Sequence, residues 1–138
     1  MHFNRDVSRE LIMNHYTKPT HKVDLGAIEK TFYSDVCSDD LKLNLNYIDG
    51  IYQNPEFDGH GCAVFIASTD ILLQEINQKS KDEAINLINL FERFVNQDST
   101  LTDDEIASLG DLQAFYNVKT HLNRVACALL ATNAIKNN

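Results

Sequence analysis

The sequence predicts an α+β fold in which a small three-stranded antiparallel sheet packs against several helices. In residues 41–46 leucines alternate with polar residues, which is the period of two expected for a strand with one buried face. After Gly61 the apolar residues recur every three to four positions, which is the helical period. Extended segments therefore come first and the main helices follow them, which is typical of α+β domains.

The strands are expected between residues 28 and 56. Asp49-Gly50 is a hairpin turn signal, because both residues tolerate the positive φ angles of a tight turn. It separates the alternating segment at residues 41–46 from residues 51–57, which we expect to return as the partner strand. A third extended segment completes the predicted sheet.

One helix is expected before the strands and four after them. The first covers residues 4–17, with Asn4 or Asp6 as its cap and Pro19 beyond its end. Residues 20–27 form a polar connector. The later helices are expected at residues 64–76, at residues 81–96, from Thr102 or Asp103 to about Gly110, and at residues 121–137.

Composition predicts one domain over residues 1–138, with the cytoplasm as its expected location. A chain of 138 residues with 43% hydrophobic side chains can bury a core without disulfides. The net charge of −8 argues against nucleic acid, because binding phosphates requires clustered lysine and arginine. We see no signal-peptide core and no apolar run of 18 residues, so we expect no membrane association. Three cysteines, an odd number, indicate reduced thiols. We expect a monomer or a weak dimer.

The three cysteines lie in three different settings. Cys37 is in a turn-like segment, Cys62 follows Gly59-His60-Gly61, and Cys127 lies inside an apolar helix. They are too far apart in sequence for a zinc-finger knuckle, so any site that they share must be assembled by the tertiary fold. Considered alone, Cys127 fits a small buried hydrophobic residue equally well.

Each setting suits a different role in one reactive site. Cys62 is expected at the first turn of a helix, where the helix dipole stabilises a thiolate. Cys37 in a loop would be accessible, which suits a nucleophile. Three thiolates and one further donor make a tetrahedral zinc site, and sulfur ligands also suit iron–sulfur clusters. Asp39 is the nearest candidate for the fourth ligand, and Arg124 can offset the resulting negative charge.

Four segments occur in a fixed order along the chain: Ile12-Met13-Asn14-His15-Tyr16 with Pro19, Val36-Cys37-Ser38-Asp39, Phe57-Asp58-Gly59-His60-Gly61-Cys62 with Ala67-Ser68, and Arg124-Val125-Ala126-Cys127. With them the chain resembles, from about Leu11 to its end, the SufU/IscU/NifU N-terminal family of iron–sulfur cluster assembly proteins. The segments are similar to that family's opening helix with its His-Tyr-x-x-Pro ending, its Cys-Gly-Asp motif, its Phe-x-Gly-x-Gly-Cys…Ala-Ser segment and its final cysteine helix. The SufU-type branch fits best, because residues 96–112 match its extra segment and Ala126 stands where IscU-type proteins have a histidine.

The resemblance implies a zinc site and a sulfur-transfer reaction. In SufU-type relatives three cysteines and the aspartate of Cys-Gly-Asp hold zinc, which carries over to Cys37, Asp39, Cys62 and Cys127. Those relatives accept sulfur from a pyridoxal-phosphate cysteine desulfurase of the SufS type, so Cys37 is implied as the nucleophile and downstream cluster-assembly proteins as the recipients. Ser38 departs from the glycine of the motif, which keeps Asp40 open as the fourth ligand in place of Asp39.

Three functions follow as expectations. The leading one is a zinc-dependent sulfurtransferase, whether or not it counts as an enzyme in its own right. The second is a scaffold on which a [2Fe–2S] cluster is assembled on the same ligands and passed to apo-proteins. The third is a binding domain in which zinc only stabilises the fold.

Overall fold

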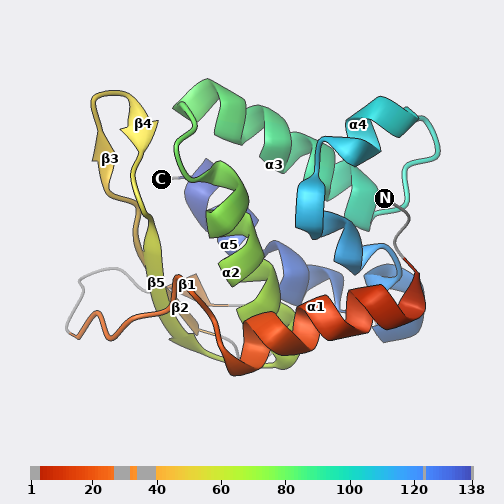
Figure 1. Ribbon diagram of the computed structural model, residues 1–138, viewed down its shortest axis with the longest axis horizontal. Helices are drawn as coiled ribbons and strands as arrows, with labels where there is room; N and C mark the ends of the chain where they lie inside the picture. Colours follow the sequence, from red (N-terminus) through yellow and green to blue (C-terminus); the bar gives the residue numbers. More distant parts are fainter. Residues whose placement is uncertain (1–3, 27–31, 34–39, 123, 138) are drawn as a thin grey trace.

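The computed structural model describes residues 4–26, 32–33, 40–122 and 124–137, and in this part the chain has the predicted α+β fold. The central element is helix α2 (Ala63–Ile76), which packs against both the sheet and the other main helices. Helix α1 (Arg5–Thr17) crosses the lower end of α2 in Figure 1. The strands lie to the left of α2 in this view. No helix in these residues is both long and apolar enough to span a bilayer.

The main sheet has the predicted three antiparallel strands. Its order is β1 (Phe32–Tyr33), β2 (Asp40–Asn44) and β5 (Glu56–His60). In the register of the central pair, Leu41 lies opposite Gly59 and Leu43 opposite Phe57. Leu41 and Phe57 are fully buried, so one face of the sheet contributes to the core.

A second, two-stranded sheet corrects the predicted hairpin. Strands β3 (Tyr47–Ile48) and β4 (Ile51–Tyr52) pair with each other across Asp49 and Gly50, whose φ angles are 53° and 80°. The turn is therefore where the sequence predicts it, and positive φ at both positions is the geometry of a type I′ turn. The prediction that residues 51–57 form one strand is wrong. Asn54 has a φ of 49° and Pro55 has no N–H to donate, so the ladder is interrupted and restarts at β5.

The α-helices after β5 follow the predicted order. In chain order the helical segments are α2, α3 (Lys81–Val95), α4 (Asp103–Ala107), a 3₁₀ helix η1 (Gly110–Phe115), a π-helical segment η2 (Val118–Leu122) and α5 (Val125–Lys136). The two short helical segments between α4 and α5 were not predicted. Both α3 and α4 begin with a capping box, formed by Ser80 with Glu83 and by Thr102 with Glu105. The last α-helix begins at Val125 and not at residue 121, because Arg124 has non-helical backbone angles (φ −117°, ψ 27°).

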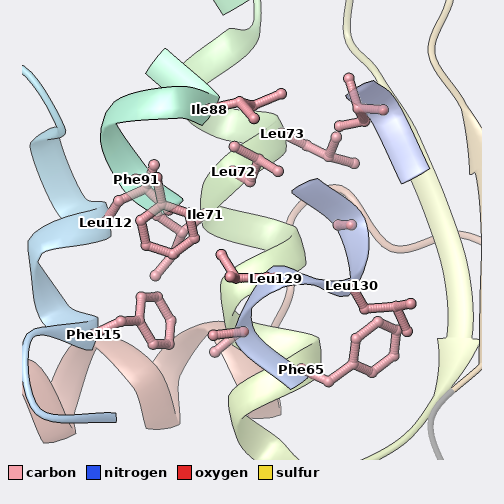
Figure 2. Close-up of a cluster of buried hydrophobic side chains, with 14 of the residues drawn as sticks. Phe65, Ile71, Leu72, Leu73, Ile88, Phe91, Leu112, Phe115, Leu129 and Leu130 are labelled. Carbon is pink, nitrogen blue, oxygen red and sulfur yellow. The ribbon is translucent and has the colours of Figure 1, made fainter. Parts of the chain in front are cut away.

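The core lies around α2, whose buried residues point in all directions around its axis. Figure 2 shows α2 residues Phe65, Ile71, Leu72 and Leu73 packed among side chains of three other elements: Ile88 and Phe91 of α3, Leu112 and Phe115 of η1, and Leu129 and Leu130 of α5. The rings of Phe91 and Phe115 meet edge to face, with centroids 6.0 Å apart. Helix α2 is thus held by packing on several sides, which fixes the place where the helix begins.

Candidate metal centre

Cys62 is the N-cap of α2, as the sequence predicts. Its backbone is extended (φ −74°, ψ 168°), and the next residue begins the helix. The thiol-bearing residue therefore lies at the helix end where backbone N–H groups point outward and the dipole is positive. The residue is half-buried.

Strand β5 delivers Cys62 to this position, and two segments hold β5 in place. On one side it pairs with β2, and on the other the backbone N–H of Phe57 donates to His21 O (2.9 Å) while Val23 donates to Phe57 O (2.9 Å). Gly59 keeps an ordinary strand conformation, but a Cβ on it would overlap the backbone carbonyl of Asp40. At this position glycine is therefore required for the close approach of β2.

Asp58 fastens the same strand through its carboxylate. It accepts hydrogen bonds from the backbone N–H groups of Leu25 (3.2 Å) and Gly59 (2.8 Å), and Lys22 Nζ lies 3.5 Å from it. Burial alone would raise the pKa of Asp58, but the two backbone donors and the lysine outweigh it and hold that pKa below its usual value. Asp58 is thus anionic in the folded protein, and it stabilises the strand just before Cys62.

Cys127 lies in the first turn of α5 and is completely buried. Helix α5 packs against α2, and Arg124, the N-cap of α5, lines the same pocket as Cys62. The beginnings of the two helices therefore meet at one end of the molecule, each with a cysteine at or within its first turn. Tertiary packing has brought together the beginnings of two helices that are far apart in the sequence.

The other two predicted ligands, Cys37 and Asp39, lie outside the described residues. The four-ligand set of Cys37, Asp39, Cys62 and Cys127 therefore stays a prediction. Among the described residues there is no group of three or more histidine, cysteine, aspartate or glutamate side chains that could hold a metal ion. What the described part contributes is Cys62 and Cys127, each at the beginning of a helix, and cysteine sulfur is a ligand that zinc and iron–sulfur clusters both accept.

Asp40, the alternative fourth ligand, is already engaged by His60. It lies opposite His60 in the sheet, and its Oδ1 accepts the backbone N–H of His60 (2.6 Å) and lies 3.3 Å from the ring Nδ1. The His60 side chain is 89% exposed, so the ring lies over the surface end of β5. One carboxylate oxygen of Asp40 therefore joins β2 to β5 at the pair of Asp40 and His60, next to Gly61.

A buried polar link holds α1 against α2, the helix that Cys62 begins, and the sequence did not reveal it. His15 Nδ1 lies 2.6 Å from Oδ2 of Asp70, a completely buried residue of α2. Asp70 also accepts the backbone N–H groups of Thr20 (3.2 Å) and His21 (2.7 Å). His15 therefore links α1 to the interior of the fold, and its side chain is only 13% exposed. No pattern in the sequence pairs residues 15 and 70, which are joined only by the crossing of α1 over α2.

Beside Cys62 is a pocket of about 570 Å³ that sequence analysis did not predict. Helix α1 contributes Arg5, Ser8 and Arg9 to its wall, and Arg124 contributes from the start of α5. The spacing of Arg5, Arg9 and Met13 along α1 is the one available signal, since residues four apart share a helix face. That signal alone does not show which element the face is turned toward.

Comparison with known proteins agrees with this fold. The family model of the NifU-like N-terminal domain matches residues 7–137. The zinc-dependent sulfurtransferase SufU of Bacillus subtilis is 29% identical, over 99% of this chain and 93% of the relative. The iron–sulfur cluster assembly scaffold protein IscU of Streptococcus pyogenes is 26% identical, over 91% of this chain and 78% of the relative.

Solved structures show the same likeness. The crystal structure of FiSufU from the thermophile Fervidobacterium islandicum AW-1 superposes with a TM-score of 0.76 at 27% identity, over 92% of each chain. The N-terminal part of a NifU-like protein from Brucella abortus has a TM-score of 0.74 over 97% of this chain and 94% of that chain, and its 17% identity supports the fold alone. The chain belongs to the NifU-like N-terminal domain family, the family of the iron–sulfur cluster assembly proteins SufU and IscU.

Proposed function

We propose that this protein is a zinc-dependent sulfur acceptor that works with a cysteine desulfurase in iron–sulfur cluster assembly. The observation that carries the proposal is the position of Cys62 at the N-cap of α2, beside the beginning of the helix that contains Cys127. The similarity to SufU along 99% of the chain supports zinc as the metal and sulfur transfer as the reaction.

The proposed ligands are Cys37, Asp39, Cys62 and Cys127. Bound zinc would keep the cysteine ligands as thiolates at neutral pH and protect them from oxidation. Asp39 is preferred over Asp40, because Asp40 already bonds His60 through one carboxylate oxygen. Arg124 is placed to offset the negative charge of this ligand set, since it precedes Cys127 by one helical turn and lines the pocket at Cys62.

In the proposed reaction Cys37 is the nucleophile. Its thiolate attacks the outer sulfur of a persulfide on the desulfurase, a new S–S bond forms on Cys37, and the desulfurase cysteine leaves as a thiolate. Atoms and electrons balance without an external oxidant or reductant. Downstream cluster-assembly proteins would then take the sulfur from Cys37.

Replacing the nucleophile tests this assignment. We expect Cys37→Ser to abolish the stimulation of a SufS-type cysteine desulfurase, measured as sulfide or alanine produced from cysteine, because a hydroxyl cannot form a persulfide. Ser38→Ala, which changes the neighbouring side chain and leaves every proposed ligand in place, should keep the stimulation. Undiminished stimulation by Cys37→Ser would contradict the role of Cys37.

A second candidate function is a scaffold for [2Fe–2S] assembly, favoured by the similarity to the S. pyogenes scaffold protein IscU. Ala126 weighs against it, because IscU-type proteins have a histidine directly before the last cysteine. Anaerobic reconstitution with iron and sulfide decides between the two. A stable coloured cluster that moves to an apo-protein would support the scaffold, and its absence would favour sulfur transfer.

A further inference from the structure

The pocket beside Cys62 contains three of the four arginines of the chain. Arg5 and Arg9 come from α1 and Arg124 from the start of α5, whereas Arg93 lies on α3 and pairs with Asp98 and Glu105. The chain as a whole has a net charge of −8, so this concentration of positive charge opposes the general trend of the molecule. Guanidinium groups match carboxylates with two parallel hydrogen bonds, which makes the pocket suited to an anion.

A buried hydroxyl in the same wall lacks a partner. Ser8 is 4% exposed and lines the pocket between Arg5 and Arg9. Its Oγ forms no hydrogen bond within the described part of the chain. Buried hydroxyl groups in folded proteins are nearly always hydrogen-bonded, so an orphaned one beside a cavity indicates a partner that arrives with a ligand.

The rest of the described lining is mostly apolar. It consists of Ile12, the 44% exposed Met13, Ala63 and Val64, together with Cys62 and the amide side chain of Asn117. About 570 Å³ is the volume of a small-molecule site. A fitting ligand therefore has carboxylates for the arginines, a short apolar body, and a group that belongs beside a reactive cysteine.

We propose that this pocket binds a small thiol that carries carboxylates, and that this thiol is an acceptor of the transferred sulfur. The sulfur-transfer half of the proposal rests on the function proposed above, whereas the binding half stands without it. Under the proposed function Cys37 and Cys62 are ligands of one metal ion, which would bring a persulfide on Cys37 close to a thiol bound beside Cys62.

The transfer step is balanced. The ligand thiol loses its proton to solvent, and its thiolate attacks the outer sulfur of the protein persulfide. The S–S bond of the protein breaks, a new S–S bond forms in the ligand persulfide, and the protein cysteine leaves as a thiolate. The outer sulfur keeps its proton, and no net oxidation or reduction takes place.

Calorimetry on the full chain with its bound metal tests the binding half. The probe is S-methylglutathione, which has two carboxylates and a blocked sulfur, so that no sulfur chemistry interferes. We expect Arg9→Gln to weaken binding about tenfold through the loss of one charge-assisted contact. Ser8→Ala should also weaken binding several-fold while leaving the melting temperature unchanged or higher, because it removes an unpartnered hydroxyl. Arg93→Gln is the matched control and should bind as the wild type does.

The proposal is overturned if the wild-type protein does not bind S-methylglutathione, or if Arg9→Gln and Arg93→Gln bind it equally well. Displacement of the probe by inorganic phosphate at equal concentration would also overturn it, because the site would then be a phosphate site.

For the transfer half, protein loaded with sulfur by a desulfurase is mixed with glutathione. Glutathione persulfide should form about tenfold more slowly with Arg9→Gln than with Arg93→Gln at limiting glutathione. Equal rates would refute the acceptor role. A failure to load sulfur would count against the proposed function alone, since the binding experiment does not require it.

Discussion

Individual residues at the end of β5 determine where Cys62 lies. Gly59 lets the backbone of β2 approach, and Asp58 fastens the strand to the segment at residues 22–25. Asp40 closes the sheet at His60, two residues before the cysteine. Asp40 is the alternative to Asp39 as a metal ligand, and the other residues are not proposed as ligands. Each of them nevertheless constrains the position of Cys62.

Gly59→Ala tests the close approach between β5 and β2. The added Cβ would overlap the carbonyl of Asp40, so the strands must separate, and we expect a loss of about 3 kcal/mol in the free energy of unfolding. Gly26→Ala is the control. No heavy atom lies within 4 Å of its Cβ position, and its φ of 58° costs about 1 kcal/mol for a residue with a side chain. Urea titration measures both, and equal losses would contradict the steric explanation.

The lowered pKa of Asp58 predicts that the stability of the folded protein depends on pH. Its pKa is lower in the folded protein than in the unfolded chain, so its stabilising contribution is fully present above the ordinary aspartate pKa of about 4. The contribution is lost as the pH falls through the folded-state pKa. We expect the melting temperature of Asp58→Asn to lie below that of the wild type at pH 6, and the gap to narrow toward pH 3. A gap that stays constant over this range would show that the carboxylate charge is not the cause.

At the scale of elements, α1 crosses α2 and contributes Arg5, Ser8 and Arg9 to the wall of the pocket beside Cys62. The link is Asp70 of α2, whose carboxylate contacts His15 and the backbone of Thr20 and His21. Elements that begin with a local signal were predictable: the capping boxes at Ser80 and Thr102 begin α3 and α4 within a residue of the expected positions. Pairings between distant segments were not predictable. Neither the pairing of β2 with β5 nor the contact between residues 15 and 70 produces a periodic pattern in the sequence.

Asp70→Ala tests this link. The substitution removes three hydrogen bonds to a buried side chain and leaves the backbone N–H groups of Thr20 and His21 without their acceptor, so we expect a loss of about 3 kcal/mol in the free energy of unfolding. Asp82→Ala, at an exposed position in the first turn of α3, should cost no more than about 0.5 kcal/mol. Similar losses for the two variants in urea titrations would mean that Asp70 does not hold α1 on α2.

At the scale of the whole molecule, the fold brings two cysteine-bearing helix starts together around a core centred on α2. The α+β class and the helix that Cys62 begins followed from the sequence, because apolar periodicity and glycine position are local signals. The pocket of Arg5, Ser8 and Arg9 did not, because those residues become neighbours of Cys62 only through tertiary packing. The roles of Cys37 and Asp39 derive from family resemblance, and experiment must test them directly.

Native mass spectrometry of the anaerobically purified protein, before and after addition of a cysteine desulfurase and free cysteine, tests the central claim most directly. We predict one zinc ion per chain at the start and, after the reaction, a gain in mass of sulfur that maps to Cys37. Iron and inorganic sulfide in place of zinc, or added sulfur on a residue other than Cys37, would contradict it.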